Sequence, residues 1–478
     1  MTVTTSPARP AASAAVAGAG WAGLLVLLGG AFITTLDFFI VNVAIPATQR
    51  DLHASSSMIQ FVVAGFGLSL AAGLIMGGRL GDLYGRRRLF AIGLAVFTIA
   101  SAACGTATTA GFLVGARVVQ GVGAALLMPQ VLAIINTVHT GEQRAKAFNA
   151  YGMAIGFGGV FGQLIGGVLI KADIAGLGWR SIFLINVPIG AVALALTPRL
   201  VPESRAAGAR LDLVGTVLVS LGLVAIVYPL VQGQQQGWPE WTWVCLAGSV
   251  PLLVAFTLHQ RRLSARGGSP LIDPALFRGR AFSAGTALNL IYSMTTASFF
   301  LVLALYLQDG RGLSAMASGL IFLPLGIGYF VCSFLSGKAT ARLGRQVLAL
   351  GALVVAVGYA LLAGTVSALG AHGSIAAIIP SLLIIGAGMG FVMAPLPAIV
   401  LAGTDPHHAA SASGVLNTAQ QAGGAIGVAL IGVVFYGALG THPGLGGYPH
   451  AFALGLILLV GVSVAVAATV QALPGRRG

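Results

Sequence analysis

Long apolar runs dominate the sequence, and short polar segments that carry most of the charged residues separate them. A helix needs about 20 apolar residues to cross the hydrocarbon core of a bilayer. Because lipid offers the backbone no hydrogen-bond partners, each such run must form a helix. We therefore predict an all-α membrane protein with fourteen transmembrane helices, at roughly 21–45, 58–78, 89–109, 112–137, 149–171, 181–200, 211–232, 242–259, 282–307, 315–337, 346–366, 374–402, 412–437 and 451–472.

The composition supports this class independently. Hydrophobic residues make up 57% of the chain and charged residues only 8%, whereas a soluble domain has about 25% charged residues. The net charge of +14 does not indicate nucleic-acid binding, because the basic residues are spread between the apolar runs. The cysteines all fall inside apolar runs, which excludes a disulfide framework and favours packing roles for Cys104, Cys245 and Cys332.

The basic residues also predict the orientation of the chain. If the N-terminus is cytoplasmic, twenty of the 25 Lys and Arg residues lie inside, four lie outside and Arg117 lies within a span. Cytoplasmic loops carry such an excess, so we expect a multi-pass plasma-membrane protein with both termini in the cytoplasm. Residues 1–20 are rich in Ala, Ser and Pro, and we expect them to be disordered. The run after them is too long for a signal-peptide core, so it is predicted to be a retained span.

The segment between the second and third runs reads GRLGDLYGRRR at 78–88. It resembles the signature loop between spans 2 and 3 of the major facilitator superfamily, with Leu83 where that pattern has a basic residue. The resemblance implies that the loop latches the two halves of a transporter in one state, through Gly78, Asp82, Gly85 and Arg86. Physically, Asp82 is expected at the start of the third span, where the helix dipole favours a carboxylate, and within reach of Arg86 four residues later. Helix capping alone is the alternative role.

A weak internal repeat predicts the domain organisation. The segment GKATARLGR at 337–345 repeats the loop that starts at Gly78, with Ala341 in place of Asp82. Span 10 then corresponds to span 2, and parallel repeats of this kind occur in the major facilitator fold. We predict two six-helix halves, at 21–200 and 282–472, with two inserted spans and their linkers at 201–281 and a short tail at 473–478.

Asp37 is the only acidic residue that we place inside a span. A charged carboxylate in hydrocarbon is costly, so an acid there favours a site that binds and releases a proton. The alternative is a carboxylate that merely bridges helices. The surrounding sequence, LDFFIVNVAIP at 36–46, resembles the span-1 motif of the 14-span drug:proton antiporter family, and Asp37, Asn42, Ala44 and Pro46 match it. The resemblance implies that Asp37 is the membrane-embedded acid of that family.

Span 4 contains LVGARVVQGVGAA at 113–125. It resembles the family motif that is linked to proton transfer, which implies a proton-coupling role for Arg117 beside Asp37. Counted from the outer ends of their spans, Gln120 matches the depth of Asp37 more closely than Arg117 does. The alternative for Arg117 is a side chain that reaches back to the outer interface.

Span 5 contains GFGGVFGQLIGG at 156–167 and resembles the antiporter signature of that span, with Gln163 in place of its proline. We expect the missing proline to remove a kink. Glycines at three- and four-residue spacing allow close helix packing, and this is the role predicted for Gly158, Gly162, Gly166 and Gly167.

Two further blocks resemble the same family. WRSIFLINVPIG at 179–190 opens span 6, where Trp179 and Arg180 are expected to be interfacial anchors. SGVLNTAQQAGGA at 413–425 lies in span 13, and its amides either face the cavity or bridge helices. The residues that we consider candidates for the substrate cavity are Asn42, Gln120, Met128, Gln163, Asn417 and Gln421.

These observations predict a proton-coupled exporter of lipophilic cationic or neutral drugs or natural products that works by alternating access. A proton-coupled uptake symporter of the same superfamily is the alternative. The sequence has no cluster of His, Cys and acidic residues, so an enzyme is disfavoured and no metal or cofactor is expected. A channel is disfavoured by the single acid in a span and by the repeat. The expected partners are a small-molecule substrate, protons and the lipid bilayer, without nucleic acid, and the protein is expected to be monomeric.

Overall fold

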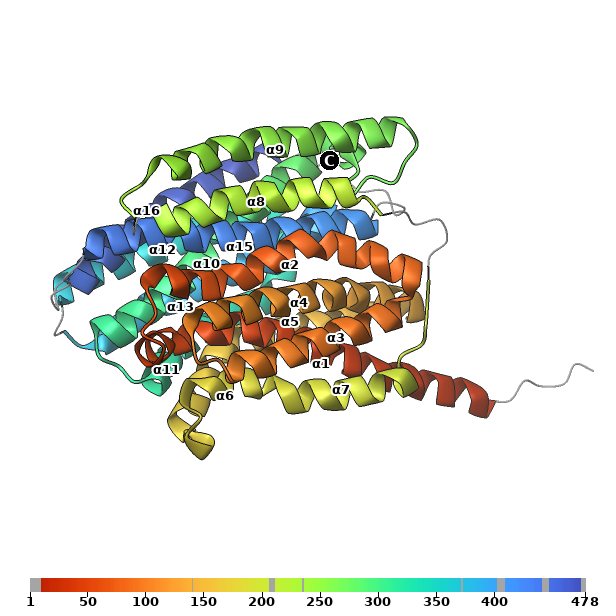
Figure 1. Cartoon of the computed structure of the whole chain (residues 1–478), viewed down its shortest axis with the longest axis horizontal. Helices are drawn as coiled ribbons and strands as arrows, with labels where there is room; N and C mark the ends of the chain where they lie inside the picture. The colour runs from red at the N-terminus through yellow and green to blue at the C-terminus, as the bar shows by residue number, and fades with distance from the viewer. Residues whose placement is uncertain are drawn as a thin grey trace, which may run out of the picture.

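The protein is an elongated bundle of helices that run along its long axis (Figure 1). It is described here from a computed structural model that covers residues 10–139, 141–205, 211–233, 236–370, 373–401, 409–440 and 447–473. These residues contain no strand. The helices are α1 (Pro10–Asp51), α2 (Ser56–Tyr84), α3 (Arg86–Gly105), α4 (Ala110–Val138), α5 (Gly141–Ala172), α6 (Ser181–Leu184), α7 (Asn186–Leu200), α8 (Leu213–Gly233), α9 (Glu240–Ala265), α10 (Arg280–Leu305), α11 (Ala315–Leu343), α12 (Gln346–Leu369), α13 (Ile379–Met393), α14 (Leu396–Leu401), α15 (Ala409–Leu439) and α16 (Gly447–Thr469).

The number of helices that could cross a membrane confirms the predicted class. Thirteen segments of the described chain are long and apolar enough, or fourteen if the bent halves of α5 are one span. The prediction that α5 would lose its kink with the proline is wrong, because α5 bends by 47° between Ala150–Gly159 and Phe161–Ala172. Gly158 and Gly159 stand directly before the bend, and paired glycines are a known cause of kinks.

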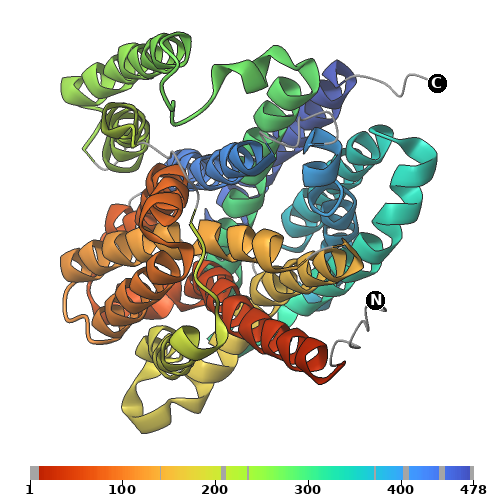
Figure 2. The same ribbon diagram turned by 90° about the vertical axis from the view of Figure 1, so that its right-hand side faces the viewer.

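The helices form two groups with an inserted pair between them in the chain. Helices α1–α7 pack on one another, as do α10–α16, and the groups meet where α2 contacts α15 and where α5 contacts α11. We call these two places the α2–α15 seam and the α5–α11 seam. The inserted α8 lies against both α2 and α15, and α9 packs on α8 at the edge of the bundle (Figure 2).

The N-terminal segment differs in part from expectation. Helix α1 begins at Pro10, so residues 10–20, which we expected to be disordered, are helical. Residues 1–9 and 474–478 of the predicted tails lie outside the described residues.

The α5–α11 seam is closed at one end of the bundle and wider at the other. We call the end with the α2–α3 and α11–α12 turns the inner end, since we expect it to face the cytoplasm; it is on the right of Figure 1. Towards the outer end, a Cβ added at Gly167 would lie 2.6 Å from the Ala315 carbonyl oxygen, and one at Gly319 would lie 2.7 Å from that of Gln163.

Further towards the inner end the same helix faces lose this close approach. The contact continues as far as Gly156, where an added Cβ would lie 3.5 Å from the Phe330 ring. Gly337 follows Gly319 by about five turns, and Gly152 precedes Gln163 by about three turns. A Cβ added at Gly152 or Gly337 would meet nothing within 4 Å. The outer end is closed further by Gln308, whose Nε2 donates to the Val43 carbonyl 2.8 Å away, across the two groups. Along this seam the two groups therefore pack more closely towards the outer end than towards the inner end, and we interpret the structure as a state that is wider inside.

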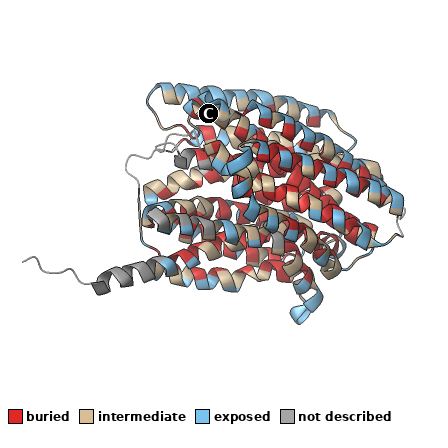
Figure 3. Ribbon diagram, turned by 180° about the vertical axis from the view of Figure 1, so that it is seen from behind, coloured by how far each residue is buried: buried red, intermediate tan, exposed pale blue. Residues whose placement is uncertain are grey.

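Burial follows the contacts between helices. Buried residues gather where helices face one another, and exposed residues cover the outside of the bundle (Figure 3). Many exposed side chains are large and apolar, such as Trp243 and Val244 of α9, which are 60% and 70% exposed. Such a surface suits contact with lipid rather than water.

Candidate functional site

Asp37 of α1 lies at the centre of a buried polar cluster. Its Oδ2 pairs with Nη1 of Arg117 from α4. Its Oδ1 accepts hydrogen bonds from Nε2 of Gln120 at 2.9 Å and from Nδ2 of Asn186 at 2.8 Å. Asp37, Arg117, Gln120 and Asn186 are all 0% exposed. The sequence predicted the first three as neighbours, and the structure brings them together.

Arg117 is held from several sides within the same cluster. Its Nε donates to the Val62 carbonyl at 3.0 Å, and its Nη1 also donates to Oε1 of Gln120 at 2.8 Å. The guanidinium carbon lies 4.3 Å from the centre of the Phe66 ring, a distance typical of a cation–π contact. Arg117 is therefore not a side chain that reaches the outer interface. Its Nη2 has no hydrogen-bond partner among the described residues.

A second layer of side chains orients the first. Ser101 of α3 accepts from Gln120 at 3.1 Å and from Asn186 at 3.0 Å, and donates to the Phe183 carbonyl at 2.9 Å. Sequence reasoning missed Ser101 and Asn186 as site residues. Asn186 could have been found, because it stands inside the family-like block of span 6, whereas Ser101 is a single hydroxyl in an apolar run.

The cluster belongs entirely to the first group of helices. Its side chains come from α1, α3, α4 and the first residue of α7, and its backbone acceptors from α2 and α6. Removing one partner from a buried ion pair leaves an uncompensated charge, which is strongly destabilising. Proton binding at Asp37 would make such a change, and Val62, Gln120 and Phe66 would then remain as neutral partners for Arg117.

Asn42 and Gln163 meet at another point of α1. Nδ2 of Asn42 and Nε2 of Gln163 both donate to the Phe39 carbonyl, at 3.1 and 3.0 Å. Their Oδ1 and Oε1 atoms have no hydrogen-bond partner among the described residues, although both side chains are buried. Two acceptor oxygens without partners next to the α5–α11 seam suit a water molecule or a polar group of a substrate.

The glycines of α5 serve two different faces. A Cβ added at Gly158, Gly162 or Gly166 would lie 2.6–3.2 Å from atoms of α1. The predicted close packing is present there. Gly167 instead faces α11 across the seam.

The remaining residues predicted for the substrate cavity are not part of the Asp37 cluster described above. Met128 is partly buried and packs against the apolar core of the first group, which is a packing role. Asn417 and Gln421 are half-buried on α15. A Cβ added at Gly67 of α2 would lie 3.9 Å from the Gln421 carbonyl, so this part of α15 borders the α2–α15 seam.

The loop after α2 departs from expectation in one respect. Asp82 pairs with Arg86 at 2.9 Å, as the spacing predicted. However, Asp82 lies in the last turn of α2, not at the start of α3. The dipole argument for Asp82 is therefore wrong, because the C-terminal end of a helix disfavours a carboxylate.

The carboxylate at the start of α3 is Glu203, from the connection between α7 and α8. Its Oε1 accepts the Arg87 backbone N–H at 3.1 Å, and its Oε2 lies 3.8 Å from Nε of Arg87 and 4.0 Å from Nε of Arg88. Gly85 has φ +110°, and a Cβ there would lie 2.8 Å from the Glu203 carboxylate. The backbone conformation therefore requires glycine at Gly85, and a side chain there would also displace the Glu203 carboxylate.

Two features of the outer end were not expected. Trp179 Nε1 donates to Asp51 at 3.0 Å and Arg180 pairs with the same carboxylate at 2.8 Å, so these residues are specific partners of α1 and not only interfacial anchors. A π-helical turn, Tyr306–Gly310, extends the span of α10 to Gly310 and includes Asp309. Asp37 is therefore not the only acid within a candidate span; our predicted boundary stopped two residues short.

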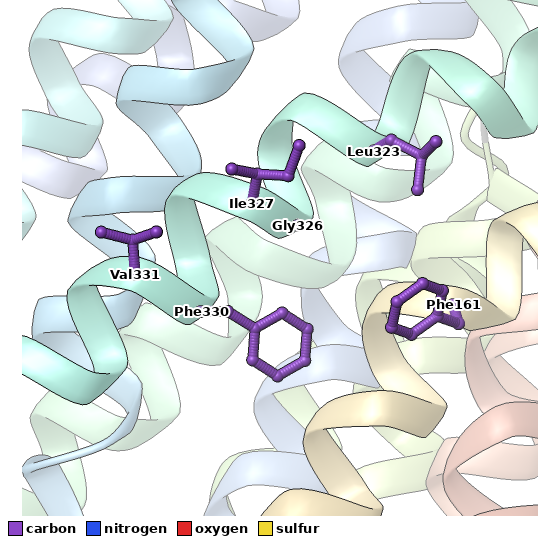
Figure 4. Close-up of a pocket in the computed structure, with 6 residues that line it drawn as sticks. All are labelled: Phe161, Leu323, Gly326, Ile327, Phe330 and Val331. Atoms are coloured by element: carbon purple, nitrogen blue, oxygen red, sulfur yellow. The ribbon is translucent and has the colours of Figure 1, made fainter.

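An apolar cavity of about 220 Å³ lies at the α5–α11 seam (Figure 4). Its lining consists of Phe161, Leu323, Gly326, Ile327, Phe330 and Val331. None of the cavity residues predicted from the sequence is among them. The Phe330 ring also lies 5.3 Å from that of Phe157. An apolar lining of this kind suits apolar groups.

Comparison with known proteins identifies relatives along nearly the whole chain. The family model described as Major Facilitator Superfamily matches residues 27–428. A probable actinorhodin transporter of Streptomyces coelicolor is 39% identical and covers 88% of this chain and 73% of its own length. A puromycin resistance protein of Streptomyces alboniger is 38% identical, with coverages of 92% and 90%. A multidrug resistance protein of Mycobacterium tuberculosis is 31% identical, with coverages of 85% and 74%.

Solved structures share the fold at low identity. A POT family transporter in complex with a thioalcohol-conjugated peptide has a TM-score of 0.69 at 15% identity, covering 94% of this chain and 95% of its own. A bacterial homologue of the lysosomal transporter Spinster, in an inward-facing conformation, has a TM-score of 0.67 at 18% identity and covers 98% of both chains. These two similarities establish the architecture alone.

Proposed function

Because the chain belongs to the Major Facilitator Superfamily, whose members are transporters and not enzymes, we propose that it is a proton-coupled exporter of drugs or natural products. It would act in the plasma membrane by alternating access, with both termini in the cytoplasm. The direction of transport is inferred from relatives whose names describe resistance to, or transport of, antibiotics. The predicted resemblance to 14-span drug:proton antiporters agrees with these relatives.

The observation that carries proton coupling is the fully buried pair of Asp37 and Arg117. A charged carboxylate so deep in the bundle depends on its cationic partner and on its hydrogen-bond donors. A proton that joins Asp37 releases Arg117 from the pair and changes the charge of the cluster by one unit. A ligand or proton shifts a conformational equilibrium only through such a difference between states.

The same charge limits the class of substrate. Helix α11, the counterpart of α2 in the second group, contains no acid that could neutralise a second positive charge. Asp309 of the same group lies in the π-helical turn at the outer end of its span, away from the level of Asp37. A dication would leave one charge uncompensated, at an effective cost of several kcal/mol. We therefore propose monovalent lipophilic cations and neutral amphiphiles as substrates, in preference to dications of similar size.

The direct test measures dye efflux and drug susceptibility in a pump-deficient host, with and without a protonophore. We expect the protein to lower dye accumulation, and the protonophore to abolish this effect. The Asp37→Asn variant should behave like the protonophore-treated cells, since asparagine cannot take up a proton. Asp173→Asn is the matched control, because Asp173 is an exposed carboxylate that only accepts the Gly178 N–H. Higher accumulation in the presence of the protein would instead identify an uptake symporter.

Substrate charge is tested in inverted vesicles energised with a pH gradient. A monocation, a dication and a neutral dye of similar size are compared, and the dication should be transported least. Equal transport of the dication, or full monocation transport by the Asp37→Asn variant, would show that Asp37 is not the coupling site.

A further inference from the structure

Both connections that lead into and out of the inserted pair contact the turn region between α2 and α3, which comprises the last two turns of α2 and the start of α3. The α7–α8 connection contributes Glu203, described above, and Ser204, whose carbonyl accepts the Arg86 N–H at 2.9 Å. The α9–α10 connection contributes Pro270, whose carbonyl accepts Nη2 of Arg79 at 3.2 Å. The end of α2 and the start of α3 are therefore bound by both segments that join the inserted pair to the two groups of helices.

A buried carboxylate ties these two connections together. Asp212, just before α8, has a side chain that is 3% exposed. Its Oδ1 accepts the Gly215 N–H at 2.8 Å and lies 2.8 Å from Nε2 of His259, while its Oδ2 accepts Nε2 of Gln260 at 2.6 Å. Oε1 of Gln260 in turn accepts the Ile272 N–H at 3.1 Å. One carboxylate thus joins the start of α8, the end of α9 and the connection to α10.

Helix α8 also reaches both groups of helices within the membrane. Leu223 of α8 forms a small apolar cluster with Ala71 of α2 and Ala422 of α15. Closer to the inner end, the Thr216 hydroxyl lies 3.8 Å from Sδ of Met76 on α2. The inserted pair therefore lies across the α2–α15 seam and is fastened at its inner end by Asp212.

We propose that Asp212 is a positioning residue of the transport cycle, which holds α8 and α9 as a strap across the α2–α15 seam and stabilises the state with the wide inner end. This role rests on the proposed transport function, because it concerns the balance between the two states of alternating access. When the inner end closes, α2 and α15 must shift relative to each other. The strap contacts both of them, so its contacts in this state oppose that shift.

The environment of Asp212 keeps this carboxylate charged. Burial alone would raise its pKa, but the hydrogen bonds from Gln260, Gly215 and His259 outweigh burial and hold the pKa below the ordinary value. An Asp212→Asn variant replaces one carboxylate oxygen with an amide nitrogen, which is itself a donor. In place of Oδ1 this nitrogen would face the Gly215 N–H, and in place of Oδ2 it would face Nε2 of Gln260. The substitution therefore breaks the strap at neutral pH while preserving side-chain size.

The test uses two reporter cysteines in full-length protein from which Cys104, Cys245 and Cys332 have been removed. Gly337→Cys reports the inner end and is labelled in inverted vesicles with a membrane-impermeant maleimide. Met316→Cys reports the outer end of the α5–α11 seam and is labelled from outside in intact cells. Asp212→Asn should slow inner labelling by about threefold and accelerate outer labelling, as expected for a population shift between two states.

The paired reporters separate the strap from a merely structural role. General loosening would accelerate labelling at both positions, which would overturn the proposal, as would unchanged rates at both. Gln260→Met breaks the link to Ile272 but leaves the caps of α8, so it should shift both rates in the same directions if Asp212→Asn fails to fold. Glu240→Gln, an exposed carboxylate at the outer end of the same inserted pair, is the matched control and should change neither rate.

The labelling needs neither substrate nor a proton gradient. A shift in labelling without drug export would retain the strap and refute the exporter. Export that depends on Asp37 with unchanged labelling in both strap variants would refute only the strap.

Discussion

Asp37 and Asp212 are two buried carboxylates that the same chain stabilises in different ways. Asp37 lies among membrane-spanning helices and pairs with the guanidinium of Arg117, with two amide donors besides. Asp212 lies at the inner end, where it accepts a backbone N–H and an amide and lies beside His259. No Arg or Lys is among the described partners of Asp212.

The difference supports the proposed roles, in which Asp37 changes its charge during transport and Asp212 does not. At Asp37 a fixed cation, Arg117, compensates the charge. A proton that joins Asp37 therefore leaves Arg117 with neutral partners alone. At Asp212 neutral donors supply most of the stabilisation, so the group keeps its charge and serves geometry. A carboxylate in an ion pair is suited to proton coupling, and a carboxylate held by neutral hydrogen-bond donors is suited to holding helices together.

The largest expected effect tests the fixed cation. Arg117→Ala removes the partner of a buried carboxylate and should lower the free energy of unfolding by about 3–5 kcal/mol. Combining it with Asp37→Asn removes both charges, so the double variant should be more stable than Arg117→Ala alone. Thermal unfolding of the purified protein in detergent measures both. If the double variant is the less stable of the two, the cation is not the main partner of Asp37.

A smaller effect is expected at the other carboxylate. Gln260→Ala takes a donor from Asp212 and leaves the Ile272 N–H without its acceptor, at a cost of about 1–3 kcal/mol for a buried group. The same unfolding measurement applies. A loss as large as that of Arg117→Ala would remove the distinction between the two sites.

Acid sharpens the comparison further. The pKa of Asp212 is lowered in the folded protein, while an unfolded aspartate has a pKa of about 3.9. The stabilisation is therefore complete above the unfolded value and is lost as the pH falls through the folded value. Unfolding temperatures should fall between pH 7 and about pH 3 by more in the wild-type protein than in Asp212→Asn. Equal falls would mean that the carboxylate contributes nothing to this stability.

The smallest effect on stability is expected at Asp82, which is partly exposed and pairs only locally with Arg86. Asp82→Asn should change the free energy of unfolding by about 0.5 kcal/mol or less. It should nevertheless slow turnover, if the loop acts as a latch, without changing dye affinity. A variant with weaker affinity and an unchanged maximal rate would contradict the latch.

The all-helical class and the contact of Asp37 with Arg117 and Gln120 were predictable from the sequence. Length and apolarity almost alone determine whether a segment forms a transmembrane helix. Counting residues from the ends of two spans gives the depth of each side chain, and this count placed Asp37 and Gln120 at a similar level. Asn186 was harder to identify, because its contact with Asp37 depends on how α7 packs against α1. That packing is a tertiary property without a local signal.

The same reasoning explains the errors at helix ends. Helix boundaries depend on caps and turns and are the least certain part of any sequence reading. One misplaced boundary put Asp82 on the wrong helix, and another left Asp309 outside its span. The contacts of Asp212 with His259 and Gln260 join residues nearly fifty positions apart, and nothing in either segment indicates the other.

The location of the Asp37 cluster has a consequence for how the proposed exporter would avoid a proton leak. All of its contacts lie within the first group of helices, so a rigid-body rotation of that group against the second would carry the cluster along intact. Opening and closing the two seams is then one motion. Admitting water to Asp37 is a second motion, and it takes place among α1, α3, α4 and α7. If Asp37 is the coupling site, tight coupling depends on the correlation between these two motions, and a variant that loosens only the internal one would dissipate the gradient without moving substrate.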